Sequence, residues 1–178
     1  MKRLIFVLSA AAILSSCASA GNATKPPELD VPFGAEAEIS YDGSECTAKI
    51  VRYGSGRWEF TITEPYALEG LTVTESGGKT TFSMLGMEST ADISGAAVSM
   101  ARALSSAYDA AAAGGEVTHG SAGETALTGT SDIGRYRVTL GENAEPAVIA
   151  SEDCKLKAQL SSFTVMPENE VTAELDES

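Results

Sequence analysis

The sequence predicts a mainly β domain of the α+β class, in which a curved antiparallel sheet or half-barrel carries one mid-chain Ala-rich helix packed across its concave face. Most segments between residues 33 and 165 alternate apolar and polar side chains with the period of two that is typical of half-buried strands. Short Gly-containing turns separate these segments, which favours antiparallel pairing of consecutive strands. Only the run near residues 95–113 has helical spacing, and a sheet with one apolar face needs a cover for that face.

The first three strands are predicted to form a meander. In residues 33–41 apolar and polar side chains alternate without a break. Residues 45–53 and 57–62 alternate in the same way, and the turns between the three segments contain Gly. Pro65 ends the third strand, because proline has no amide hydrogen to donate to a sheet.

The middle of the chain is predicted to hold another hairpin, a loop and the helix. Residues 71–75 and 79–85 are strand candidates joined by a Gly-Gly turn, and residues 86–89 are predicted as a loop. In residues 95–113 apolar side chains recur at the spacings of three and four that are typical of a helix: Met100, Leu104, Tyr108 and Ala111. Two consecutive glycines then end the helix.

The chain is predicted to return to strands after the helix. Two short segments come first and three clearer ones follow, giving strands over residues 116–119, 125–130, 135–140, 146–150 and 154–165. A single domain therefore spans residues 33–165. Residues 166–178 are acidic and lack apolar periodicity, so they are predicted to form a disordered tail.

The N-terminal residues predict an export signal with a lipid attachment site. Two basic residues precede an apolar run that is far shorter than the roughly 20 residues needed to span a bilayer, so residues 1–16 are predicted as a signal peptide. The end of this run, Leu14-Ser15-Ser16-Cys17, resembles the bacterial lipobox. That resemblance implies that Cys17 becomes the lipidated first residue of an exported chain in the cell membrane or envelope, held by two or more acyl chains. Cleavage after Ala20, which would release a soluble protein, is the alternative.

Residues 17–32 are predicted as a flexible tether between this anchor and the domain. The segment is small, polar and proline-containing, and Pro26 and Pro27 favour an extended backbone. The chain has a formal net charge of −13, so nucleic acid is excluded as an expected partner. Neither a metal set nor a catalytic motif accompanies the single histidine, His119, and we expect no cofactor and no enzymatic activity.

Two cysteines remain if Cys17 carries lipid. Cys46 and Cys154 both fall in step with inward-facing residues near predicted strand starts. In an exported protein such a pair is a candidate disulfide. The alternative is a pair of buried free thiols, which pack as small apolar side chains.

The order of elements resembles that of the lipoprotein-carrier superfamily, the LolA, LolB and LppX-like proteins. The resemblance is carried by the lipobox with Leu14 and Cys17, the strand over residues 33–41, the strand 57–62 that runs into Glu64-Pro65, the hairpin LTVTESGGKTTFSML and the helix that follows. It implies an open β-barrel whose helical lid covers an apolar cavity for acyl chains. This sequence offers one long helix where a fuller lid would use more.

One set of large apolar side chains is the candidate lining of such a cavity: Ile39, Trp58, Phe60, Phe82, Met84, Met100, Leu104, Tyr108 and Tyr136. A core and an apolar pocket use the same residue types, so the sequence leaves both interpretations open. The leading functional hypothesis is a membrane-anchored, non-enzymatic binding or carrier module for a lipid or other apolar ligand. The alternative is an envelope scaffold or accessory subunit that binds another protein without a ligand.

Overall fold

The computed structural model describes residues 28–90, 96–120 and 123–167. The predicted signal peptide, the lipobox with Cys17 and the tail from residue 168 lie outside the described residues. The described elements occur in this order: β1 (Phe33–Tyr41), β2 (Ser44–Gly54), β3 (Arg57–Glu64), the 3-10 helix η1 (Tyr66–Leu68), β4 (Thr72–Ser76), β5 (Lys79–Met84), β6 (Met87–Thr90), α1 (Ala96–Gly114), β7 (Glu116–His119), β8 (Thr125–Ser131), β9 (Gly134–Leu140), β10 (Pro146–Ser151) and β11 (Leu156–Val165).

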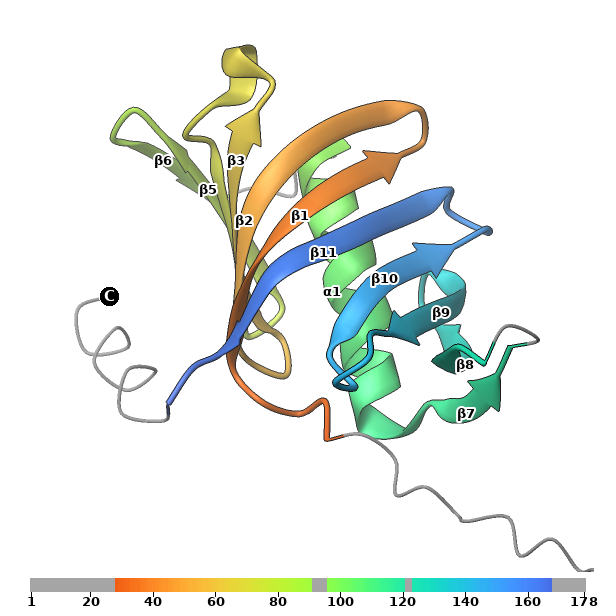
Figure 1. Cartoon of the computed structure of the whole chain (residues 1–178). Coiled ribbons are helices and arrows are strands. Elements are labelled where there is room, and N and C mark those ends of the chain that lie inside the picture. Colours follow the sequence, from red (N-terminus) through yellow and green to blue (C-terminus); the bar gives the residue numbers. More distant parts are fainter. Residues whose placement is uncertain (1–27, 91–95, 121–122, 168–178) are drawn as a thin grey trace, which may run out of the picture.

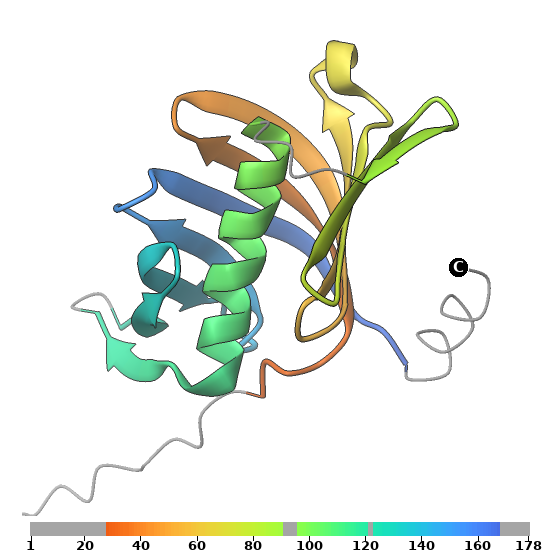
Figure 2. The ribbon, with the colours of Figure 1, turned by 180° about the vertical axis from the view of Figure 1, so that it is seen from behind.

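All the strands belong to one 11-stranded antiparallel sheet, in the order β6-β5-β4-β3-β2-β1-β11-β10-β9-β8-β7. The two meanders on either side of α1 join through β1 and β11, where Phe33 pairs with Val165 and Tyr41 with Leu156. The sheet curls around α1, and the end formed by β3 to β6 splays away from the helix (Figures 1 and 2). This confirms the predicted fold class. Within the described part of the chain, no helix combines the length and apolarity needed to cross a membrane.

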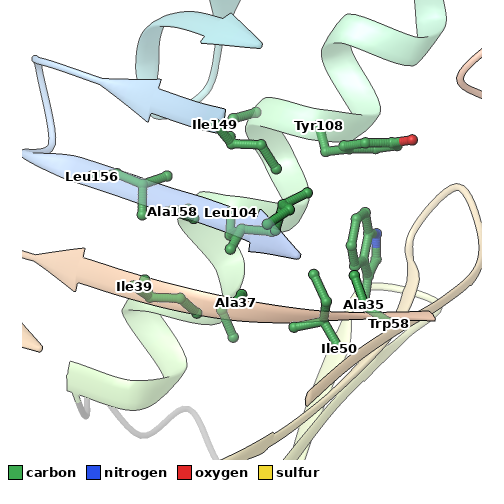
Figure 3. Close-up of a cluster of buried hydrophobic side chains, with 14 of the residues drawn as sticks. Ala35, Ala37, Ile39, Ile50, Trp58, Leu104, Tyr108, Ile149, Leu156 and Ala158 are labelled. Atoms are coloured by element: carbon green, nitrogen blue, oxygen red, sulfur yellow. The ribbon is translucent and has the colours of Figure 1, made fainter. Parts of the chain in front are cut away.

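Among the described residues one α-helix, α1, covers the concave face of the sheet. It contacts β8, β9, β10, β11 and β4, and its buried face includes Met100, Leu104 and Tyr108. Several alanines on the same face allow the helix to approach the sheet closely, while Trp58 and Phe60 of β3 fill the space opposite it. The centre of the core is therefore filled with buried side chains, including Trp58, Leu104 and Tyr108 (Figure 3).

The structure corrects one predicted loop and one strand boundary. Residues 86–89, predicted as a loop, largely form the short strand β6, which pairs with β5 across the two-residue turn Leu85-Gly86. Both turn residues have positive φ, as this type of hairpin requires. All four residues of β6 are exposed, so no alternation of apolar and polar residues marked the strand. Strand β11 begins at Leu156, because Cys154 lies in the turn before it.

Candidate ligand site

The predicted apolar set is largely the core of the protein. Seven of its members are buried together: Ile39, Trp58, Phe60, Met100, Leu104, Tyr108 and Tyr136. Phe82 is half-buried against this cluster, and Met84 is half-buried outside it. The rings of Trp58 and Tyr108 meet edge to face with centroids 5.3 Å apart. This packing favours the core interpretation for the seven buried residues, and leaves Phe82 and Met84 at the margin.

Both cysteines are free thiols in the structure. Strand β1 lies between Cys46 on β2 and strand β11, which follows Cys154. Two strand spacings amount to roughly 10 Å, whereas bridged Cα atoms lie about 4.4–6.8 Å apart. The candidate disulfide is therefore not formed, and Cys46 instead contacts Met100, with 3.3 Å between the two sulfur atoms. Burial raises the pKa of the Cys46 thiol.

The last residues of the predicted tether pack against the domain. Leu29 is buried, and its carbonyl oxygen accepts a hydrogen bond of 3.1 Å from the Tyr108 hydroxyl. Burial raises the pKa of Tyr108, so this hydroxyl keeps its proton at neutral pH. The sequence did not indicate this docking, because one leucine without periodicity carries no local pattern and its partner lies on a distant helix.

A buried arginine holds the same segment in place. The Arg52 guanidinium donates to the carbonyl oxygen of Val31 at 3.1 Å, to Asp30 at 2.8 Å and to Asp109 of α1 at 2.9 Å. Asp109 also accepts hydrogen bonds from the Trp58 indole at 3.0 Å and from a backbone amide. A buried cation is stable only when it is paired and hydrogen-bonded, so Arg52 links β2, α1 and residues 30–31 into one unit.

A second buried contact joins the helix to the opposite side of the sheet. The Ser105 hydroxyl donates to Glu75 of β4 at 2.5 Å, and burial raises the pKa of the Glu75 carboxyl. Sequence reasoning missed Glu75, Arg52 and Asp109. Arg52 had a usable signal, because it falls in step with Ala48 and Ile50 on the inward face of its strand.

Residues 28–31, which we call the docked segment, pack against the end of the sheet. An apolar groove lies where they meet it. It has a volume of about 420 Å³, and we call it the terminal groove. Its walls come from four separate parts of the chain: Leu29 and Val31 of the docked segment, Tyr108 of α1, Pro146 at the start of β10, and Phe163 and Val165 of β11. Figure 1 shows the docked segment in orange, running from β1 toward the C-terminal end of α1.

The terminal groove has fixed walls and a polar rim. Phe163 packs on Phe33 with ring centroids 4.7 Å apart, and Val165 is 56% exposed at the open side. Glu28 and Glu145 line the groove as well, and Glu145 accepts a hydrogen bond of 2.9 Å from the backbone of its own turn. Pockets of roughly 300–1,000 Å³ with mainly apolar walls are typical ligand sites. The negative rim favours an apolar ligand whose head group is neutral or positive.

A second depression, of about 470 Å³, has a different character. Polar side chains of the outer sheet face line it, including Glu38, Glu45, Glu64 and Lys157. In the part of the chain that the structure describes, no group of three or more acidic, His or Cys side chains is arranged to hold a metal ion. His119 is exposed and lies 3.3 Å from the Thr125 hydroxyl.

Comparisons with known proteins give structural similarity at low sequence identity. No protein-family model matches the sequence, and no curated protein matches it either. An uncharacterized conserved protein from Thermus thermophilus is similar in structure, with 13% identity, a TM-score of 0.45, and coverage of 82% of this chain and 86% of that chain. The LolA superfamily protein NE2245 from Nitrosomonas europaea has 11% identity, a TM-score of 0.43, and coverage of 82% and 92%.

A further similar structure is the Pseudomonas aeruginosa MucA/MucB complex, with 16% identity, a TM-score of 0.40, and coverage of 81% of this chain and 56% of that chain. One similar structure thus belongs to the LolA superfamily that the sequence resembles.

Proposed function

We propose that this chain is an exported bacterial lipoprotein, anchored through acyl chains on Cys17, whose domain binds or carries a lipid or other apolar ligand without enzymatic chemistry. The observation that carries the proposal is the terminal groove, with its apolar walls and a volume of about 420 Å³. Its polar rim leaves room for a neutral or cationic head group at the solvent side.

The position of the terminal groove relative to the anchor supports this function. Glu28, at its rim, is joined to Cys17 by a short stretch of chain whose extended length is at most roughly 40 Å. A domain on such a tether stays close to the membrane that supplies its ligand. The acidic chain would be repelled by anionic head groups, so the acyl anchor is the main attachment.

The anchor is tested by metabolic labelling. Cells that express the full chain are grown with radioactive palmitate, and we expect label on the wild-type protein and none on Cys17→Ser, because the thiol is the attachment atom. Ser161→Ala, on the exposed outer face of β11, is the control and should keep its label. An unlabelled wild-type protein that appears in the soluble fraction would instead support cleavage after Ala20.

The ligand site is tested with a photoactivatable monoacylglycerol that carries a diazirine in its acyl chain. Full-length protein in membranes is irradiated, and crosslinked peptides are mapped by mass spectrometry. We expect crosslinks in residues 28–31, 143–146 and 163–165. Val165→Lys should reduce them at least about tenfold, because a charged group at the mouth of an apolar site must lose water when ligand enters.

Thr164→Lys is the matched control, because it adds the same charge one residue away on the exposed opposite face of β11. It should leave crosslinking within about twofold of the wild type. If crosslinks mapped to Phe82 and Met84 and their amount were unchanged in Val165→Lys, the ligand site would lie at the margin of the core. Absence of crosslinks from both regions would contradict ligand binding itself.

Docking of another envelope protein is the second candidate function. It is favoured by a separate observation, the exposure of large apolar side chains at the far end of the sheet.

A further inference from the structure

Two neighbouring hairpins of the splayed half of the sheet expose large apolar side chains at their ends. We call Tyr66, Leu68, Leu85 and Met87 the hairpin-end surface; they are 89%, 39%, 87% and 70% exposed. The first two belong to η1, between β3 and β4, and the others to the turn and first residue of the β5–β6 hairpin. Both ends lie at the top of Figure 1, with the docked segment at the bottom.

The fold itself does not account for these side chains. Leu85 has a φ of 53° in a two-residue turn, where Asn, Asp or Gly is preferred and a large residue is strained. It gains little from burial at that position, because 87% of it is exposed. A bulky apolar residue at a place favoured by neither conformation nor burial indicates a contact with something outside the chain.

The charges around the hairpin-end surface define what that contact is. Glu64, Glu69 and Glu88 are exposed beside it, and residues 58–78 and 80–90 contain no Lys or Arg. Lys157 lines the outer depression together with Glu64, but Glu38 and Glu45 lie there too, so this neighbourhood remains negative. Anionic lipid head groups would be repelled from such a surface. A second copy would bring the same negative charges and would be repelled as well. Complementarity therefore requires a partner that combines apolar and positively charged groups.

We propose that the hairpin-end surface docks a protein partner that presents apolar side chains flanked by Lys or Arg. Tyr and Met are enriched at the centres of protein interfaces, and the surrounding glutamates form the charged rim. The surface and the terminal groove share no residue, so separate variants can test the two sites.

The test uses three synthetic helical peptides of equal length as probes. The first combines Leu on one face with Lys on the other, the second replaces Lys by Glu, and the third replaces Leu by Ser. Binding to the full chain in non-ionic detergent is followed by fluorescence anisotropy. We expect the Leu and Lys peptide alone to bind, and Tyr66→Ser with Leu85→Ser to weaken it at least about tenfold, because exposed aromatic anchors dominate such interfaces.

Matched variants separate this surface from the general negative charge of the protein. Val165→Ser removes an exposed apolar side chain from the other end of the molecule and should change binding less than about twofold. The triple change of Glu64, Glu69 and Glu88 to Gln should weaken binding about fivefold or more and reduce its salt dependence. The same change at three other exposed positions, Glu36, Glu116 and Glu142, should have less than half that effect.

Three outcomes would overturn the proposal. Equal binding by wild type and the Tyr66→Ser, Leu85→Ser variant would show that the peptide binds elsewhere. Slower hydrogen exchange in residues 64–69 and 85–88 when the protein alone enters phosphatidylglycerol vesicles would make the membrane the occupant. Concentration-dependent sedimentation that this double variant abolishes would make it a second copy.

Discussion

Replacing Asp109 with alanine is expected to lower the free energy of unfolding by about 3–5 kcal/mol, the usual cost of removing one partner from a buried ion pair. Arg52 has a side-chain exposure of 1%, and its bond to Asp109 is only 2.9 Å long. The alanine variant leaves this cation buried without its carboxylate from α1. It also leaves the Trp58 indole without its acceptor. The change is measured by urea unfolding of the full chain, as a lower midpoint with an unchanged slope.

Asp30→Ala is the control for this prediction, because it removes the other carboxylate that binds Arg52. The Asp30 side chain is 70% exposed, and exposed ion pairs contribute only about 0–1 kcal/mol. If Asp109→Ala and Asp30→Ala lowered the free energy of unfolding by similar amounts, the hydrogen bonds of Arg52 would not be anchored in the core. A loss below about 1 kcal/mol for Asp109→Ala would contradict the buried-pair interpretation directly.

Local sequence pattern was enough to predict most of the sheet and the helix. The alternation in residues 33–41 recurs as the alternating burial of β1, and the spacing of Met100, Leu104 and Tyr108 recurs as the buried face of α1. Strand β6 has no such signal, because its four residues are all exposed and its position is set by pairing with β5. Apolar periodicity indicates which side of an element is buried, so it cannot predict an element whose residues are all exposed.

The terminal groove could not be predicted in the same way. Its walls come from residues 28–31, 143–146 and 163–165, and their meeting depends on the long-range pairing of β1 with β11 and on the hydrogen bond from Tyr108 to Leu29. For a related reason the sequence could not show whether the predicted apolar set lines a pocket or fills the core. Apolar side chains that line a space and those that fill it have the same chemistry, and only the packing of the helix decides between them.

Truncation of Phe60 to alanine is expected to lower the free energy of unfolding by about 3–5 kcal/mol, because the residue is fully buried between the sheet and α1. Phe82→Ala is its matched control. The two phenylalanines lie in one cross-strand row, each opposite Val73 of β4, and both face the concave side. Phe82 is only half-buried, so its loss should cost about 1–2 kcal/mol. Urea unfolding of both variants under identical conditions gives the comparison.

The variants Phe60→Ala and Phe82→Ala also test where an apolar ligand binds. A residue that fills the core is expensive to remove and does not touch ligand, whereas a residue that lines a ligand cavity can be removed at small cost but weakens binding. With the site in the terminal groove, Phe82→Ala should leave crosslinking of the photoactivatable monoacylglycerol within about twofold of the wild type, while Val165→Lys reduces it at least about tenfold. If Phe60→Ala instead cost less than about 1 kcal/mol and both truncations lowered crosslinking, the space between the sheet and α1 would be the ligand cavity, and the filled core described above would not persist in solution.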